Sequence, residues 1–495
     1  MVISMKKSTD GLLARLSRPV GLTEGTPWKV ILRYAGPIML SYFLQQIYVL
    51  TDAIICGQVL HAQEVAGVND TFPLTFIFLQ FAFGCTAGFS VITAKCVGGG
   101  DARGVRKSLV TQLTLSLIIS AVLTVSSILL LPWMLRAINV TPDNPVVYGA
   151  AYAYCFVIFL GILAQMGYNF ICGILRAYGD SVTPLIFLVI STAFNVGLDL
   201  LLLVPLRMGP AGAAIATVAA QLISMILCGA YTFLRYRELR ITREDWRLTR
   251  EDFVSHLSQG VPLGLQFSIL AIGIIVMQGA VVEFDLTESG EMLSSTPAQN
   301  GFGAASKLIN FLMAAFNGLG SAILGYNAQN YGKGEYRRIR RGTVQALIIM
   351  LLFSLLCLSA GMLLSIDGAY QHIFMSEDKI TAESIQYGNT YLRLDIGLYF
   401  ILGFLIVVRS AVQGICQPGY VLGAGVAELI ARIVICAYLP AIVNGGPVYA
   451  GASTAAFAAV GLGDPGAWLT ASLVLLIPFI GRILRMRYEK ELANV

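Results

Sequence analysis

Four oxygen-bearing side chains stand in otherwise apolar stretches of the first half of the sequence: Asp52, Asn195, Asp199 and Thr217. Asn195 and Asp199 are four residues apart, so a helix places them on one face. An ionisable side chain inside a membrane-spanning helix is costly and is a functional candidate by default. Two carboxylates that meet in a low-dielectric site cannot both stay ionised without a cation. These residue types therefore favour the binding of a proton or of a hard cation such as Na⁺.

The composition explains why these side chains stand out. The chain has 495 residues, of which 56% are hydrophobic and 12% charged, whereas a soluble protein carries about 25% charged residues. Apolar runs of about 20 residues, each long enough to cross a bilayer, recur along the whole length. We therefore predict an all-α polytopic membrane protein with twelve spans, at residues 34–57, 67–95, 109–134, 147–173, 182–205, 210–234, 258–283, 301–328, 343–366, 388–412, 418–440 and 467–487.

The distribution of Lys and Arg sets the predicted orientation. With both termini in the cytoplasm, 27 of the 33 Lys and Arg residues fall in inner segments, three in outer loops and three within spans. This split follows the positive-inside rule, so the basic residues are topological and no nucleic-acid partner is expected. The first residues have no cleaved signal peptide pattern. We expect a multi-pass protein of the cytoplasmic (inner) membrane of a prokaryote, with both termini cytoplasmic.

The depth of the four oxygen-bearing residues supports one shared site. Counted from the predicted outer ends of their spans, Asp52, Asp199 and Thr217 all lie five to seven residues inside, which is about 8–10 Å at the rise of a helix. Asn195 lies one turn from Asp199. The four residues can therefore meet at one level as a cation site, with Na⁺ or H⁺ as its ion. The alternative is a buried, hydrogen-bonded cluster that fixes helix packing.

The two halves of the sequence repeat each other. The stretch 83–109 resembles 316–343, and at a constant offset of 234 their glycines and charges coincide, as in Gly98 with Gly332. The repeat unit is six spans, an even number, so both copies have the same orientation and are related by a pseudo-two-fold axis along the membrane normal. We predict a cytoplasmic N-terminal segment at 1–33, two six-helix lobes at 34–234 and 258–487, a cytoplasmic linker at 235–257 and a tail at 488–495.

The second half carries different chemistry at the matching positions. At an offset of 233, the counterparts of Asn195 and Asp199 are Glu428 and Arg432. A Glu four residues before an Arg can form an internal ion pair, which we expect to be structural, with gating or substrate contact as the alternative. Asp395 is expected near an outer end, where its side chain reaches the interface.

Other polar or flexible side chains on the spans are candidates for the lining of a substrate cavity, with helix-packing hydrogen bonds as the equal alternative. A proline inside the first span, Pro37, makes a bend plausible there. The cavity candidates are Gln45, Tyr48, Asn169, Gln266, Asn310 and Met313.

Several classes of protein are disfavoured. The nine cysteines lack metal-ligand spacing, and no ATP-binding domain is present, so uphill transport would need an ion gradient. An intramembrane enzyme such as a prenyl transferase would need clustered acids for a magnesium diphosphate or a Ser/His set, and the spans contain neither. A receptor without transport is disfavoured by the repeat. We expect a transporter that is not an enzyme and has no cofactor.

These residues together resemble the multidrug and toxic compound extrusion (MATE) family of cation-coupled antiporters, from about residue 30 to 440. The resemblance is carried by "AGPIMLSYFLQQIYVLTDAIICGQVL", "FAFGCTAGFSVITAKCVGGGDARGVRKS", "NVGLDLLLLVPLRMGPAGAAIATVAAQ" and "GLGSAILGYNAQNYGKGEYRRIRR". It implies a monomer of two bundles in a V, with rocker-switch export of small organic, cationic amphipathic compounds. It also implies that Asp52, Asn195, Asp199 and Thr217 bind the coupling ion, that Pro37 bends, and that Gln45 and Tyr48 line the cavity.

The sequence departs from the family at two places. One branch uses a Glu in the seventh span and an Asp in the tenth for Na⁺, but here the seventh span has no internal acid, so no second-half cation site is expected. The outer loops 284–300 and 441–466 are long, and their role is open. Two rival functions remain: a flippase for lipid-linked precursors, which should show intramembrane Arg or Lys lining both halves, and an exporter of one specific metabolite.

Overall fold

The computed structural model describes residues 18–486 and consists almost entirely of helices. The predicted tail 488–495 and the first part of the predicted N-terminal segment lie outside the described residues. The helices, with η marking short 3₁₀ or π turns, are α2 (Pro27–Val59), α3 (Ala62–Asp70), α4 (Phe72–Gly99), α5 (Ala102–Ala137), α6 (Pro145–Leu160), α7 (Ile162–Ala177), α8 (Val182–Leu203), α9 (Gly209–Arg235), η1 (Arg237–Leu239), α10 (Arg250–Val282), η2 (Glu283–Asp285), α11 (Pro297–Lys333), α12 (Tyr336–Leu364), η3 (Ile366–Gly368), α13 (Gln371–Phe374), η4 (Glu377–Lys379), α14 (Ala382–Gly397), α15 (Tyr399–Gly414), α16 (Pro418–Asn444), α17 (Thr454–Gly461), α18 (Gly463–Pro478) and η5 (Phe479–Ile483).

The helices confirm an all-α polytopic membrane protein. Ten of the described helical stretches are long and apolar enough to cross a membrane, or twelve if each of two bent helix pairs counts as one span. The pair α6–α7 is bent by 43° and the pair α14–α15 by 50°. Each predicted span coincides with one of these helices or bent pairs, and several helices extend beyond the predicted limits because their polar ends continue past the apolar run.

The predicted outer loop at 441–466 is partly wrong. It contains α17 and the start of α18, so only the segment between Asn444 and Thr454 is a loop. Ser453 caps α17, since its Oγ accepts a hydrogen bond from the Ala456 amide at 3.2 Å. Asp464 and Pro465 are typical of a turn, but they fall in the first turn of α18, where a proline needs no backbone partner.

The two repeats end their second long helix in the same way. Gly100 follows α4 with φ 71°, and Gly334 follows α11 with φ 76°. This left-handed conformation suits glycine and closes the helix end. Asp101 then caps α5 by accepting a hydrogen bond from the Gly104 amide at 2.8 Å. The glycine-rich stretch 98–104 therefore forms the turn that ends α4 and begins α5.

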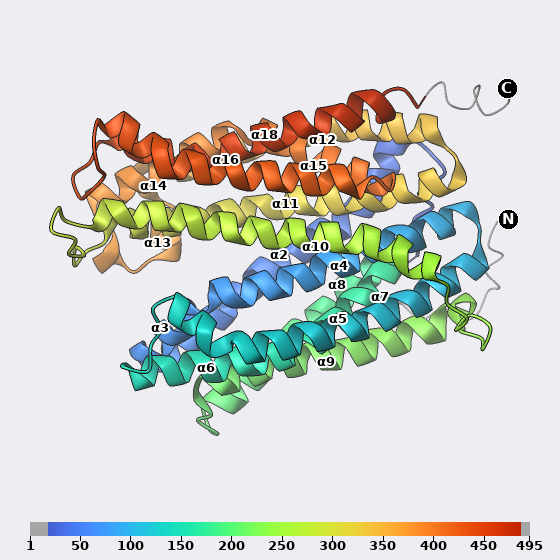
Figure 1. Ribbon diagram of the computed structural model, residues 1–495, viewed down its shortest axis with the longest axis horizontal. Coiled ribbons are helices and arrows are strands. Elements are labelled where there is room, and N and C mark those ends of the chain that lie inside the picture. The colour runs from blue at the N-terminus through green and yellow to red at the C-terminus, as the bar shows by residue number, and fades with distance from the viewer. Residues whose placement is uncertain (1–17, 487–495) are drawn as a thin grey trace.

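Figure 1 shows the helices in two groups, α3 to α9 and α10 to α18, with the first and last described residues at one end, the terminal face. The groups approach each other at the terminal face and diverge toward the opposite end, the distal face (Figure 1). The first helix of each half packs against the other half. α2 lies along α11 as well as α8, and α10 lies along α4 as well as α16.

A glycine seam holds the two groups together near the terminal face. Gly98 of α4 lies directly against the backbone of Gln329, and Gly332 of α11 lies directly against the backbone of Lys95, so a Cβ at either glycine would have no room. Gly98 and Gly332 differ by the repeat offset of 234, and so do Lys95 and Gln329, so the two contacts are equivalent under the pseudo-two-fold relation. Gln329 Nε2 also donates a hydrogen bond to the Ala177 carbonyl at 2.6 Å.

The segment that enters α2, residues 20–25, is a strap across both groups. The Arg338 guanidinium donates to the carbonyls of Gly25 (2.6 Å), Glu24 (3.1 Å) and Leu22 (3.3 Å). Asn330 Nδ2 donates to the Leu22 carbonyl as well, at 3.1 Å. On the other side, the strap makes one backbone hydrogen bond to the first half, from the Val20 amide to the Gly179 carbonyl at 3.0 Å.

Candidate functional site

Three helices of the first half bring the predicted cation ligands together. α8 packs between α2 and α9. It supplies Asn195 and Asp199, which are 1% and 0% exposed. α2 supplies Asp52 and α9 supplies Thr217. Tyr48, one turn before Asp52 on α2, lies within electrostatic range of both carboxyl groups. We call these five residues the acid cluster.

The carboxyl groups of Asp52 and Asp199 lie close enough to interact directly. Among the described residues, no donor reaches either oxygen of Asp199 or the buried oxygen of Asp52. Two negative charges repel strongly at this range away from water, and a proton shared between them or a bound cation removes that repulsion. The pair is therefore suited to hold positive charge.

The neutral members of the acid cluster leave a further oxygen available. Thr217 Oγ1 accepts hydrogen bonds from Tyr48 Oη at 3.3 Å and from Asn195 Nδ2 at 3.4 Å. With its nitrogen turned to Thr217, Asn195 keeps its Oδ1 without a donor among the described residues. Carboxylate and amide oxygens suit a hard cation. The described part of the chain contains no group of three or more His, Cys, Asp or Glu arranged to hold a metal, so a transition-metal centre is not indicated.

Pro37, the predicted bend residue, has an equivalent proline in the second half that the sequence analysis does not name. Pro37 lies inside α2, and its carbonyl accepts a hydrogen bond from Ser41 Oγ at 2.9 Å. Pro262 lies inside α10, the first helix of the second half. The two prolines are 225 residues apart in the sequence, so the repeat extends to the helices that cross between the halves. An internal alignment of the two first spans would have found it.

The predicted cavity residues differ in their exposure. Asn310 of α11 is exposed, and Gln45 and Tyr48 of α2 are partly buried. Asn169 and Met313 are also partly buried. Gln266 of α10 is different because it is only 1% exposed and lies against Gly425 of α16. Neither polar atom of its amide has a partner among the described residues.

The second half contains a charge network in place of an acid pair. The predicted contact between Glu428 and Arg432 is present at 3.8 Å, but each residue has a closer partner. Glu428 pairs with Arg409 of α15 at 2.5 Å, and Arg432 pairs with Asp464 of α18 at 2.5 Å. Tyr391 Oη also donates to Asp464 at 2.9 Å. The four charged residues Arg409, Glu428, Arg432 and Asp464 alternate in sign, so the network neutralises itself.

Three residues near this network were missed or misplaced. Arg409, which is not among the predicted site residues, lies inside α15. Asp464 was assigned to an outer loop, but it opens α18. Asp395 was expected near the interface, but it is 0% exposed, within electrostatic range of Asp464 and Arg432. Neither oxygen of Asp395 has a donor among the described residues. A charged residue within an apolar stretch is a sequence signal for each of these positions. The signal does not identify the partners, because they lie on other helices.

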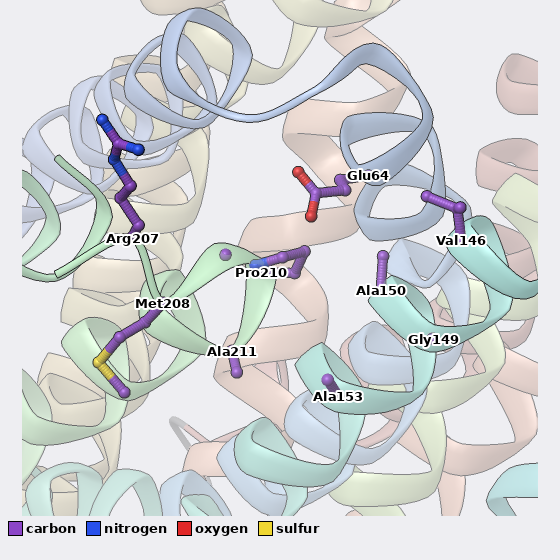
Figure 2. Close-up of a pocket in the computed structure, with 10 residues that line it drawn as sticks. Glu64, Val146, Gly149, Ala150, Ala153, Arg207, Met208, Pro210 and Ala211 are labelled. Atoms are coloured by element: carbon purple, nitrogen blue, oxygen red, sulfur yellow. The ribbon is translucent and has the colours of Figure 1, made fainter.

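A pocket of about 410 Å³ lies between α3, α6 and the start of α9 (Figure 2). Its wall carries one acid, Glu64, and one base, Arg207. Glu64 accepts a hydrogen bond from the His61 amide at 3.0 Å and thereby caps α3. None of the predicted site residues lines this pocket.

Comparison with known proteins identifies the class. The family model described as MatE matches residues 37–201 and 295–439, which is more than half of the chain. The fold resembles a solved structure described as the outward-facing conformation of a multidrug resistance MATE family transporter of the MOP superfamily. Its TM-score is 0.81 at 21% identity, and the match covers 95% of this chain and 99% of that one. The chain therefore belongs to the MATE family of membrane transporters, and it is not an enzyme.

Two curated relatives illustrate the range within the family. The chain is 29% identical over 322 residues to the "Probable multidrug resistance protein YpnP" of Bacillus subtilis (strain 168), covering 64% of this chain and 68% of the relative. It is 24% identical over 447 residues to the "FAD transporter" of Shewanella oneidensis, covering 89% of this chain and 91% of the relative. The protein is thus a multi-pass membrane transporter with bacterial relatives.

Proposed function

We propose that this MATE transporter is a secondary antiporter that exports amphipathic organic compounds, cationic drugs among them, in exchange for Na⁺ or H⁺. The observation that carries the proposal is the pair Asp52–Asp199, with three carboxyl oxygens that no donor reaches among the described residues. A cation from one side of the membrane neutralises the pair and is released on the other side. Asn195 and Thr217 supply neutral oxygens to the same site.

The alternation of access fits a rocker switch between two lobes, 34–234 and 258–487, joined by the linker 235–257. The two helix groups touch at the glycine seam and diverge at the distal face (Figure 1). We assign the terminal face to the cytoplasm, because the loops that carry most Lys and Arg lie there. In this arrangement the protein is open to the outside, and Pro37 allows α2 to bend as Asp52 gains or loses its cation.

A flippase for lipid-linked precursors is the alternative. Its support is a pair of arginines within the helices of the second half, the partly buried Arg409 and the buried Arg432, which would suit a phosphate. Both already have carboxylate partners at 2.5 Å, which leaves little charge for a ligand. An exporter of one metabolite is the third candidate, since the Shewanella relative is named an FAD transporter.

The test is dye transport in liposomes with an imposed Na⁺ gradient or an imposed pH gradient. We expect a fluorescent cationic dye to move under at least one gradient with the wild type. Asp199→Asn should reduce that movement to the level of empty liposomes, because it removes the charge that attracts the ion. Asp143→Asn, in an exposed loop, is the control. Gradient-driven transport that survives in Asp199→Asn, or no transport by the wild type, would contradict the proposal.

A further inference from the structure

A second pocket, of about 240 Å³, lies in the second half between α11 and the segment around α13. Figure 1 places α13 at the distal end of the molecule. Lys307 and Asn300 line the pocket from α11, and Ser376 and Lys379 line it from the segment that follows α13. We call it the lysine pocket. It shares no residue with the acid cluster or the charge network.

The charged side chains in the described lining of the lysine pocket are Lys307 and Lys379, and Glu377 next to them in the sequence is not part of that lining. No acidic residue whose side chain the structure describes lines it, and neither lysine forms an ion pair with a carboxylate whose position is described. The Lys307 ammonium donates a hydrogen bond to the Phe374 carbonyl at 3.5 Å, and it lies in the field of Lys379. Two ammonium groups that repel each other beside a hydroxyl and an amide favour an anion, since each gains a charge-assisted hydrogen bond from it.

Lys307 lies on the face of α11 that meets α2. Residues four or seven apart on a helix lie nearly on one face. Lys307 is four residues before Phe311, which is seven before Gly318, and both Phe311 and Gly318 contact α2. Gly318 lies against Met39, and the Phe311 and Phe43 rings are 5.1 Å apart. Position increases along α2 as it decreases along α11, so the two helices are antiparallel. Lys307 is therefore one turn beyond the last of these contacts, toward the distal face.

α2 leaves α11 at this level. Ile47, one turn beyond Phe43, is 47% exposed, and Leu50 is 38% exposed. Lys307 and Ile47 are each about 6 Å beyond the contact between the two phenylalanines, from the rise of a helix. Asp52 follows five residues later on α2. The lysine pocket and the acid cluster therefore lie at comparable heights on helices that part from each other, one basic and one acidic.

We propose that the lysine pocket binds the anionic group, a phosphate or a carboxylate, of an amphipathic ligand at the distal opening. The group has two sources: an exported compound or the head of an anionic phospholipid. Binding of the anionic group does not require that the protein is an antiporter. A role of the lysine pocket in export rests on the function proposed above. A compound that carries both charges would meet a complementary group on each side of the opening.

The test uses riboflavin 5′-phosphate and riboflavin, two fluorescent probes that differ by one phosphate. Binding is measured on the purified full chain in nanodiscs of phosphatidylcholine, without any gradient. We expect the wild type to prefer the phosphate ester, and the variant with both Lys307→Gln and Lys379→Gln to bind it about tenfold more weakly, as expected for lost charge-assisted hydrogen bonds. Lys307→Arg with Lys379→Arg should keep the preference.

The control is Lys333→Gln, an exposed lysine at the other end of α11, which should bind both probes as the wild type does. Equal binding of the two probes by the wild type, or an unchanged preference in the double glutamine variant with the wild-type melting temperature, would overturn the proposal. Asp199→Asn should retain the preference, so a failure of coupling and a failure of this site are separable.

The lipid source is tested by adding phosphatidylglycerol to the nanodiscs. Competition with the phosphate probe that disappears in the double glutamine variant supports the lipid head as an occupant. Undiminished probe binding supports a soluble ligand in the same pocket. Competition that is equal in the wild type and the double variant would mean that the lipid acts through general surface charge, and it would overturn the assignment to these two lysines.

Discussion

The two halves of the molecule repeat each other in sequence and in the glycine that ends α4 and α11, but they differ in charge at equivalent positions. Asp199 of α8 corresponds to Arg432 of α16 at an offset of 233. Asp52 of α2 corresponds to Met277 of α10 at the offset of 225 that relates Pro37 to Pro262. Met277 and Arg432 meet in the second half, where both side chains lie beside Gly463. A methionine and an arginine therefore replace the two acids.

Under the proposed function, this difference in charge assigns the coupling ion to the acid cluster of the first half, while the paired charges of the second half neutralise one another. The first half has a carboxylate pair in which three oxygens have no hydrogen-bond donor among the described residues. The second half carries a cation of its own, the Arg432 guanidinium, which is held by Asp464 and lies against Gly273. Gly273 is the counterpart of Tyr48, so the missing side chain leaves room for the guanidinium. The glycine seam, in contrast, is kept in both repeats because it depends on backbone shape alone.

The largest effect on stability is expected in the second half. Arg432→Met leaves the carboxylates of Asp464 and Glu428 with fewer cations in a buried site, so the free energy of unfolding should fall by about 3–5 kcal/mol. Chemical denaturation in detergent measures it, with Arg136→Met in an exposed position as the control. Asp199→Asn should not destabilise, because it removes a repulsion. An Arg432→Met protein as stable as the control would show that the charge network does not stabilise the second half.

A smaller effect is expected from ion binding in the first half. A cation that binds only the folded protein stabilises it, by about 3 kcal/mol at a hundred times its dissociation constant. The melting temperature of the wild type should depend on Na⁺ at constant ionic strength or on pH, through the acid cluster. Asp199→Asn should lose the dependence that the wild type shows, and Asp143→Asn should keep it. A dependence that persists in Asp199→Asn would place the ion elsewhere.

The smallest effect is expected at the glycine seam. Gly98→Ala puts a methyl group against the Gln329 backbone, so the two helix groups must separate slightly at the terminal face. We expect Cys416, which is packed in the small cluster near the seam, to react a few-fold faster with a maleimide. Gly36→Ala is the matched control because nothing lies within 4 Å of the added atom. Equal labelling rates in the two variants would show that the seam does not hold this face closed.

Much of this could be predicted from the sequence. Apolar runs locate the spans because a bilayer demands about 20 apolar residues each. The acid cluster followed from spacing and depth, since the three helices run roughly side by side. The charge network did not, because Arg409 and Asp464 reach Glu428 and Arg432 from other helices. The lysine pocket also depends on where the α13 segment folds back onto α11, which no local pattern reveals.

The strap at residues 20–25 has a consequence for the equilibrium between access states. It makes five hydrogen bonds to the second half, three from the Arg338 guanidinium, one from Asn330 and one from the Lys333 ammonium, but one backbone hydrogen bond to the first half, at Gly179. Charged hydrogen bonds contribute about 1.5–3 kcal/mol each and neutral ones about 1. In the rocker switch proposed above, opening of the terminal face would break the strap's bond to Gly179 before its bonds to the second half, so residues 20–25 would move with the second half. The population of an inward-open state would then depend on a few hydrogen bonds at the terminal face as well as on the ion.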